Sequence, residues 1–266
     1  MGQGIRFFNR SYSDITRLDL EEILISVTNN NDFKTFMVDR DPFTRYQSSG
    51  ANDDLITVEL TVDFLQDRFI SDLILVDTNL KDFELQQWDS GSMSYVTVLT
   101  ETANTANTVY KTFTGLTTDK VKLKMNKTIV ADQEKYLNLF IITSEIGQLE
   151  YRPFPRPDHD GNIIENKMID GKSKFVFNQI QHNFEIEFSG YTNINDRQLL
   201  QTLSDLKDSF LIWPCGGDEA QFSYADEGWR LEDIYLVNRS NQPSPFFTKN
   251  YYKAGTNARL LLKEVS

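Results

Sequence analysis

Several stretches of this sequence alternate between apolar and polar residues with a period of two, and this alternation constrains the fold more than any other feature. Residues 120–125 alternate three lysines with Val121, Leu123 and Met125, and residues 184–188 alternate apolar residues with glutamates. Successive side chains of a β-strand point to opposite faces, so this period predicts strands with one buried and one solvent face. Further strands are expected at residues 55–60, 69–77, 80–88, 136–142, 174–177, 210–214, 229–237 and 259–263. The sequence therefore predicts a mainly β protein.

The composition and residue pattern of the sequence change near residue 150, which favours two domains. Residues 151–162 contain three of the seven prolines and an Asp-Gly pair, a composition typical of a connection between domains. Beyond it, Asn195-Asp196 offers an N-cap and leucines follow at helical spacing, which predicts a helix near residues 196–207. We expect a first β-sandwich domain at residues 1–148 and a second, β-rich α+β domain with one flanking helix at residues 149–266.

The first domain carries an opening motif that can be named residue by residue. Val38 and Asp39 precede a short turn, which is followed by Thr44, Tyr46 and Ser48. Aspartate and threonine side chains in such a turn satisfy backbone donors. Together with the strands that follow, the motif resembles the discoidin, or galactose-binding-like, family over roughly residues 10–146. The resemblance implies a jelly-roll β-sandwich.

The second domain is expected to place two strands, a helix and then further strands in that order. This order resembles the β-sandwich-plus-helix units of phage tail tubes and baseplate rings. The resemblance implies a tail-tube-like domain that assembles with other copies of itself in a ring and with neighbouring tail or baseplate proteins. It also implies a virion location and synthesis in the host cytoplasm.

Composition limits the classes of partner. The formal net charge of -12 and the pI near 4.7 disfavour nucleic acid, because binding phosphates needs a basic face. The sequence contains no apolar stretch of the roughly 18 residues that a membrane span needs, and its start lacks an apolar signal core. The single cysteine, Cys215, rules out an internal disulfide and a cysteine-rich zinc site.

The sequence contains no recognisable catalytic constellation. Any nucleophile-and-base scheme would have to use His159 or His182 with Cys215 or a serine, and Cys215 has no cationic sequence neighbour that would lower its pKa. The 39 Asp and Glu residues are too many for a catalytic pair to be chosen by sequence. We therefore expect a protein that is not an enzyme, with a carboxylate-dependent hydrolase as a weaker alternative.

Calcium is the one cofactor that the resemblance raises. Discoidin-like sugar-binding modules often hold calcium beside the opening loop, and the matching positions here are Asp39, Asp41 and Thr44. Asn138 stands where the family's last strand carries a glutamate. Losing that carboxylate removes one negative charge from a hard-cation site and weakens it. A calcium site and a metal-free turn both stay open.

Carbohydrate binding is the commonest activity that the resemblance implies. It uses exposed aromatic residues on loops at one end of the sandwich, and Phe43, Trp88 and Tyr95 lie on or near predicted loops. Each also suits an ordinary core or rim aromatic. The lysines at positions 120, 122, 124 and 127 have two interpretations, contact with an acidic partner or protection of an edge strand against unwanted pairing.

Two functions follow. The first is a non-enzymatic virion structural protein of a phage tail or baseplate, which assembles through its second domain and displays the discoidin-like domain. The alternative is a carbohydrate-binding module protein that mediates attachment to glycans on the host surface. Residues 239–256 are either a disordered arm or an ordered contact loop, and their two prolines and paired aromatics suit an arm that orders on a partner.

Overall fold

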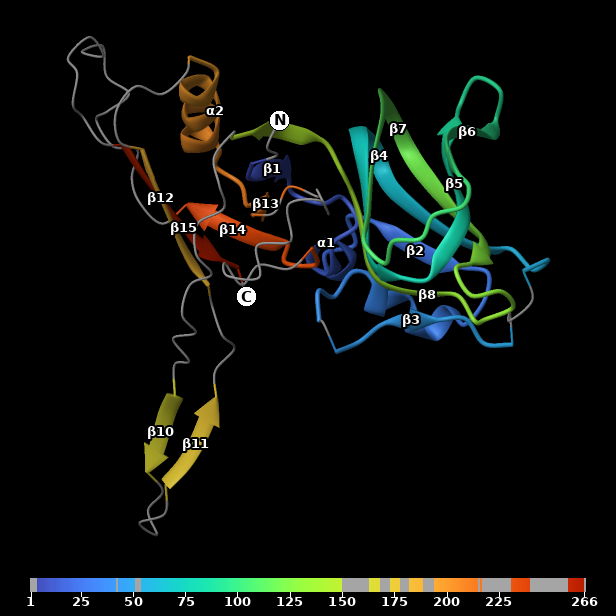
Figure 1. Ribbon diagram of the computed structural model, residues 1–266, viewed down its shortest axis with the longest axis horizontal. Helices are drawn as coiled ribbons and strands as arrows, with labels where there is room; N and C mark the ends of the chain where they lie inside the picture. The colour runs from blue at the N-terminus through green and yellow to red at the C-terminus, as the bar shows by residue number, and fades with distance from the viewer. Residues whose placement is uncertain are drawn as a thin grey trace. The chain divides into compact units, whose positions relative to one another are not determined.

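The chain divides into two compact units, both built mainly from β-strands (Figure 1). The computed structural model describes residues 4–41, 43–50, 54–149, 163–167, 173–177, 182–188, 194–214, 216, 231–239 and 258–265. Residues 11–145 form one unit, and residues 1–10 with 146–266 form the other. Among the described residues, no helix is long and apolar enough to cross a membrane.

The unit at residues 11–145 is an antiparallel β-structure with two short helical segments. Its strands follow the order β3-β8-β4-β7-β5-β6. Strand β2 also pairs with β4, on the edge opposite β7. In chain order the elements are α1 (Ile15–Asp19), β2 (Leu24–Val27), the 3-10 helix η1 (Asn31–Met37), β3 (Tyr46–Gln47), β4 (Val58–Thr78), β5 (Leu80–Asp89), β6 (Ser94–Glu101), β7 (Val109–Thr128) and β8 (Tyr136–Thr143).

Strands β4 and β7 are long because each belongs to two sheet layers. Their pairing shifts between Asp63 and Arg68, where Leu65 adopts a left-handed backbone with φ of 56°. Before this irregularity, β4 lies between β2 and the second half of β7. The second half of β7 also pairs with β5, and β5 pairs with β6; we call this the front layer. After it, β4 lies between β8 and the first half of β7, and β3 extends β8; this is the back layer.

Every second side chain along the strands of the front layer points into the hydrophobic core of this unit. The alternation expected for residues 120–125 is present, because Val121, Leu123 and Met125 are fully buried and the lysines between them face the other way. Their partners on β4 are Val62, Leu60 and Val58, also buried. The core further includes Phe64, Leu73, Leu75, Phe83, Leu85, Leu137, Phe140 and Ile142.

Two details of the expected strands differ in the structure. The strand expected at residues 55–60 begins at Val58, and Leu55 before it is 89% exposed. The strand with the lysines is not an edge, since β7 is paired with β4 on one side and β5 on the other. Edge protection is therefore the wrong interpretation of these lysines. Lys122 and Lys124 are paired with β4 on one side and with β5 on the other, and Lys120 is paired with Asp63 of β4.

The other unit contains a sheet with the order β12-β15-β14-β13-β1-β9 and a separate β10-β11 hairpin. The expected boundary after residue 148 placed the start of the chain in the first domain. Strand β1 instead pairs with β13, because Phe7 and Phe8 are fully buried beside Ile212 and Leu211. The elements are β1 (Arg6–Asn9), β9 (Glu145–Gln148), β10 (Ile163–Lys167), β11 (Ser173–Phe177), β12 (Asn183–Phe188), α2 (Ile194–Asp205), β13 (Phe210–Trp213), β14 (Tyr235–Arg239) and β15 (Ala258–Glu264).

Helix α2 occupies the place of the helix expected near residues 196–207, and Leu199 and Leu203 are its buried leucines. The strand expected at residues 229–237 is described only from Tyr235 onward. The proline-rich connection at 151–162, residues 240–256 of the expected arm, and Cys215 and His159 lie outside the described residues. A tail-tube-like identity for this unit stays a prediction.

Tyr46 of the opening motif offers a test of the sandwich. The ring is fully buried, burial raises the pKa of the phenol, and the hydroxyl donates to the Asn29 carbonyl oxygen over 2.6 Å. We expect Tyr46→Phe to lower the free energy of unfolding by about 1 kcal/mol, because one buried hydrogen bond is lost without a change in packing. Urea denaturation measures it. Phe43→Leu, at a side chain that is 95% exposed, is the neutral control, and equal stability of both variants would contradict the expectation.

Candidate functional site

The face of the front layer that points away from the core carries polar side chains from neighbouring strands. On β4 and β7 these are the residues between the buried positions, such as Glu59 and Lys122. On β5 they include Gln86, which is itself only 8% exposed. The alternation that builds the core therefore builds this second surface as well. We call it the ladder face, because the strand register sets its side chains in rows across the strands.

The pairings between the strands define three rows. The first runs Glu59–Lys124–Glu84, from β4 over β7 to β5. The second, the middle row, begins at Ser26 on β2 and crosses all five strands of the front layer. The third contains the pairs Asp63–Lys120 and Trp88–Tyr95. In full, the middle row is Ser26–Thr61–Lys122–Gln86–Thr97.

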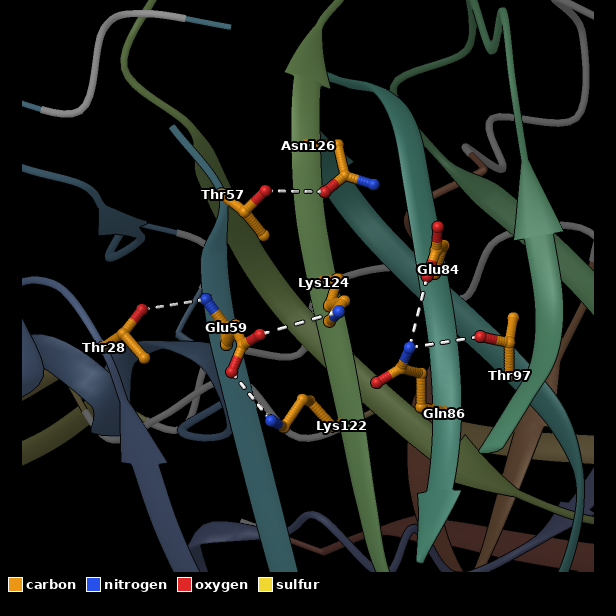
Figure 2. Close-up of polar contacts among 9 residues, drawn as sticks. All are labelled: Thr28, Thr57, Glu59, Glu84, Gln86, Thr97, Lys122, Lys124 and Asn126. Atoms are coloured by element: carbon orange, nitrogen blue, oxygen red, sulfur yellow. Dashed lines mark hydrogen bonds and ion pairs between the residues drawn. The ribbon is translucent and has the colours of Figure 1, made fainter. Parts of the chain in front are cut away.

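Polar contacts within and between the rows hold the long side chains in place. Figure 2 shows the Glu59 carboxylate between two lysines, with Oε2 at 2.8 Å from Lys122 Nζ and Oε1 at 3.8 Å from Lys124 Nζ. On the next strand, Gln86 Nε2 donates to Glu84 Oε2 at 3.3 Å and to Thr97 Oγ1 at 3.1 Å. The donors and acceptors of the ladder face are thus largely fixed before any ligand arrives.

The border of the ladder face is held in the same manner. Thr57 donates its hydroxyl hydrogen to the Asn126 amide oxygen over 3.0 Å, and the Thr28 hydroxyl accepts from the Glu59 backbone N–H over 3.0 Å. Lys120 Nζ lies 2.8 Å from Asp63 Oδ2, and the hydrogen bond that Lys120 donates to Asp63 raises the pKa of Lys120. These contacts tie β2, β4 and β7 together on their solvent side.

Two of the three aromatic residues expected to bind sugar lie together at one end of the ladder face. Trp88 and Tyr95 are cross-strand partners, and their rings meet edge to face with centroids 5.1 Å apart and an interplanar angle of 68°. Lys122 Nζ lies 4.3 Å from the centroid of the Tyr95 ring. Both rings are half-buried, and both residues lie on strands, close to the β5–β6 turn.

Phe43, the third expected aromatic, does not share this site. Its side chain is 95% exposed and precedes β3, whereas Trp88 and Tyr95 lie on β5 and β6, at the opposite end of the strand order. The structure therefore brings together only two of the three residues.

The four residues expected around calcium do meet in the opening loop. The Asp39 carboxylate accepts from the Asp41 backbone N–H at 3.0 Å and from the Thr44 hydroxyl at 2.8 Å. Burial raises the pKa of Asp39, and these two hydrogen bonds oppose the rise. From β8, Asn138 Nδ2 donates to the carbonyl oxygens of Asp41, at 3.0 Å, and of Thr44.

This arrangement does not fit a calcium ion. Calcium needs several converging oxygen ligands, and two candidate oxygens, the carbonyls of Asp41 and Thr44, here point at an amide nitrogen. Carbonyl oxygens only accept, so the donor side of the Asn138 amide must face them. Within the described ranges, no three His, Cys, Asp or Glu side chains cluster in a way that could hold a metal. Hydrogen bonds therefore close the loop.

His182, the histidine within the described residues, belongs to the other unit, and its side chain is largely shielded from solvent. Its Nδ1 is 2.6 Å from Glu264 Oε2, and its side chain is 11% exposed. Tyr235 packs on the ring with centroids 4.7 Å apart. The contact ties the residue before β12 to the C-terminal strand β15 and suits a structural role.

Comparison with known proteins gives a likeness of fold. No family model matches the sequence, and no curated protein matches it. Among solved structures, chitosan-binding module 1 of a chitosanase/glucanase from Paenibacillus sp. IK-5 matches with a TM-score of 0.40 and 16% identity, over 50% of this chain and 98% of that one. The family 32 carbohydrate-binding module of NanJ from Clostridium perfringens, solved with galactose, matches with a TM-score of 0.40 and 13% identity, over 47% and 95%.

These matches agree with the galactose-binding-like sandwich expected from the sequence, and at this level of similarity they transfer no ligand. The expected role in a phage tail or baseplate, with its ring of copies, its neighbouring tail proteins and its virion location, stays a prediction.

The opening loop predicts a metal response that can be engineered. We expect the melting temperature of the wild-type protein to be the same in calcium chloride and in EDTA. Asn138→Asp replaces a donor with a carboxylate that faces two carbonyl oxygens, which should cost about 1–3 kcal/mol in EDTA. Calcium should restore part of that loss, because the ion can be bound by the new carboxylate and both carbonyl oxygens at once. Asn138→Ala, destabilised equally in both buffers, is the control, and a wild-type melting temperature that rises with calcium would contradict the hydrogen-bonded loop.

Proposed function

We propose that the unit at residues 11–145 is a non-catalytic carbohydrate-binding domain, and that its ladder face receives the sugar. The observation that carries the proposal is the position of the Trp88–Tyr95 pair directly beside a row of fixed donors and acceptors. Ligand sites combine aromatic surface with a few placed polar groups, and the rings and the Lys122–Gln86–Thr97 row supply both.

The chemistry of a sugar explains why this combination suits it. A pyranose ring has C–H groups that pack on an aromatic side chain, and hydroxyl groups that both donate and accept. Gln86, Glu84 and Thr97 offer an amide, a carboxylate and a hydroxyl on adjacent strands. Because their side chains are already held by one another, less conformational entropy is lost when a ligand binds.

The carboxylates of the ladder face suit binding better than catalysis. Glycoside hydrolysis uses two carboxyl groups on either side of the scissile bond, one of which donates a proton. Glu59 and Asp63 instead contact lysine ammonium groups at 2.8 Å each. We propose that they position the lysines and accept hydrogen bonds from sugar hydroxyls, so that incubation with a bound glycan releases no reducing sugar.

Removing the indole of Trp88 tests the proposal. On a panel of immobilised glycans followed by calorimetry, we expect wild-type binding to at least one neutral glycan, and Trp88→Ala to weaken it at least tenfold, about 1.4 kcal/mol. The variant should keep the wild-type melting profile within a few degrees, since the ring is only half-buried. Phe43→Ala, in a comparably large aromatic away from the ladder face, is the matched control with unchanged affinity. A panel without a ligand would refute the proposal.

A further inference from the structure

We propose that the ligand is an uncharged, extended oligosaccharide that lies across the strands along the middle row, rather than a single terminal sugar. This inference rests on the proposed function and adds the class of glycan and the direction in which it binds. It is carried by the register of the front layer, by the connections between its rows and by the charge balance of the ladder face.

The length of the middle row exceeds that of one sugar. The row begins at Ser26 on β2, passes Thr61 and Lys122 and ends at Thr97 on β6, so that five adjacent strands each contribute one polar side chain. The β5 member, Gln86, is 8% exposed and braces Thr97 from below through its amide nitrogen. Neighbouring strands lie about 4.8 Å apart, so the row extends roughly 19 Å. A monosaccharide beside the aromatic pair would leave the β2 and β4 end of this row without a role.

Lys122 connects the two ends of the ladder face. Its ammonium nitrogen is 2.8 Å from Glu59 Oε2 on β4 and 4.3 Å from the centroid of the Tyr95 ring on β6. The side chain therefore crosses the middle of the row and links the aromatic end to the carboxylate end. A chain that stacks on Trp88 or Tyr95 and continues across the strands meets Lys122 and then Glu59 and Thr61.

The charge of the ladder face selects against anionic chains. Lys120, Lys122 and Lys124 stand beside Glu59, Asp63 and Glu84, so the six groups sum to zero on a protein whose formal net charge is -12. Each lysine already contacts a carboxylate. A sulfated or uronic-acid chain would have to displace these carboxylates and would meet repulsion, whereas a neutral chain uses the same groups as donors and acceptors.

Chain length provides the first test. Calorimetry with full-length protein would compare galactose, glucose, mannose and N-acetylglucosamine with their β-1,4-linked tetrasaccharides, and polygalacturonate would serve as the anionic probe. We expect at least one neutral tetrasaccharide to bind tenfold or more tightly than its monosaccharide, and polygalacturonate not to bind. Equal affinity for the monosaccharide and the tetrasaccharide, or tighter binding of polygalacturonate, would overturn the inference.

Variants on β4, at the end of the ladder face away from the aromatic pair, provide the second test. Thr61→Lys places a long side chain in the path of the ligand, and we expect it to lower tetrasaccharide affinity at least tenfold without changing monosaccharide affinity. Thr117→Lys, at an exposed threonine on the first half of β7, is the matched control with unchanged binding. Glu59→Gln leaves Lys122 and Lys124 without their shared carboxylate, and we expect this variant to gain binding of polygalacturonate.

The outcomes separate the inference from the proposed function. Binding that depends on Trp88 but is indifferent to Thr61→Lys and to chain length would leave the carbohydrate-binding proposal intact and refute the extended ligand. No binding of any neutral sugar to the wild-type protein would refute both. A melting profile of Thr61→Lys that matches the wild type ensures that a loss of affinity reports on the binding face.

Discussion

The register between β4 and β7 is the constraint on which the rest of the sandwich depends. It sets Val58, Leu60 and Val62 opposite Met125, Leu123 and Val121, which are all buried. A slip of one residue would turn the lysines of β7 into the core and the apolar residues into solvent. Burying unpaired ammonium groups costs far more free energy than any surface contact contributes, so the core fixes the register strongly.

The same register produces the candidate site as its other face. With the core pairs aligned, Glu59 must stand opposite Lys124, Thr61 opposite Lys122 and Asp63 opposite Lys120. Each ion pair on such a solvent face contributes little to stability, with a typical value of about 0–1 kcal/mol. Their consequence is order in the side chains of the ladder face, and the proposed binding of a sugar depends on this order.

The opening loop shows how one substitution changes the role of a motif. The Asp39 and Thr44 pair closes the turn as the chemistry of aspartate and threonine in turns predicts, while Asn138 supplies N–H donors at the position where a carboxylate would support a cation. An amide donor and a metal ion both satisfy carbonyl oxygens, but only the amide does so without dependence on the ion's concentration. The loop is thus held by the chain's own groups.

The sequence by itself determined the mainly β character, the buried face of β7, the turn at Asp39 and the existence of helix α2, because periodicity and turn chemistry are local. It also singled out Trp88 and Tyr95 as aromatic residues on or near a loop. Only the tertiary structure decided that β7 is a central strand, that Phe43 lies apart from the aromatic pair, that Arg6–Asn9 joins the C-terminal sheet, and that Gln86 and Thr97 share a row with Lys122. Pairing between strands distant in sequence is set by how the apolar faces pack together, and no local pattern encodes which strands become neighbours.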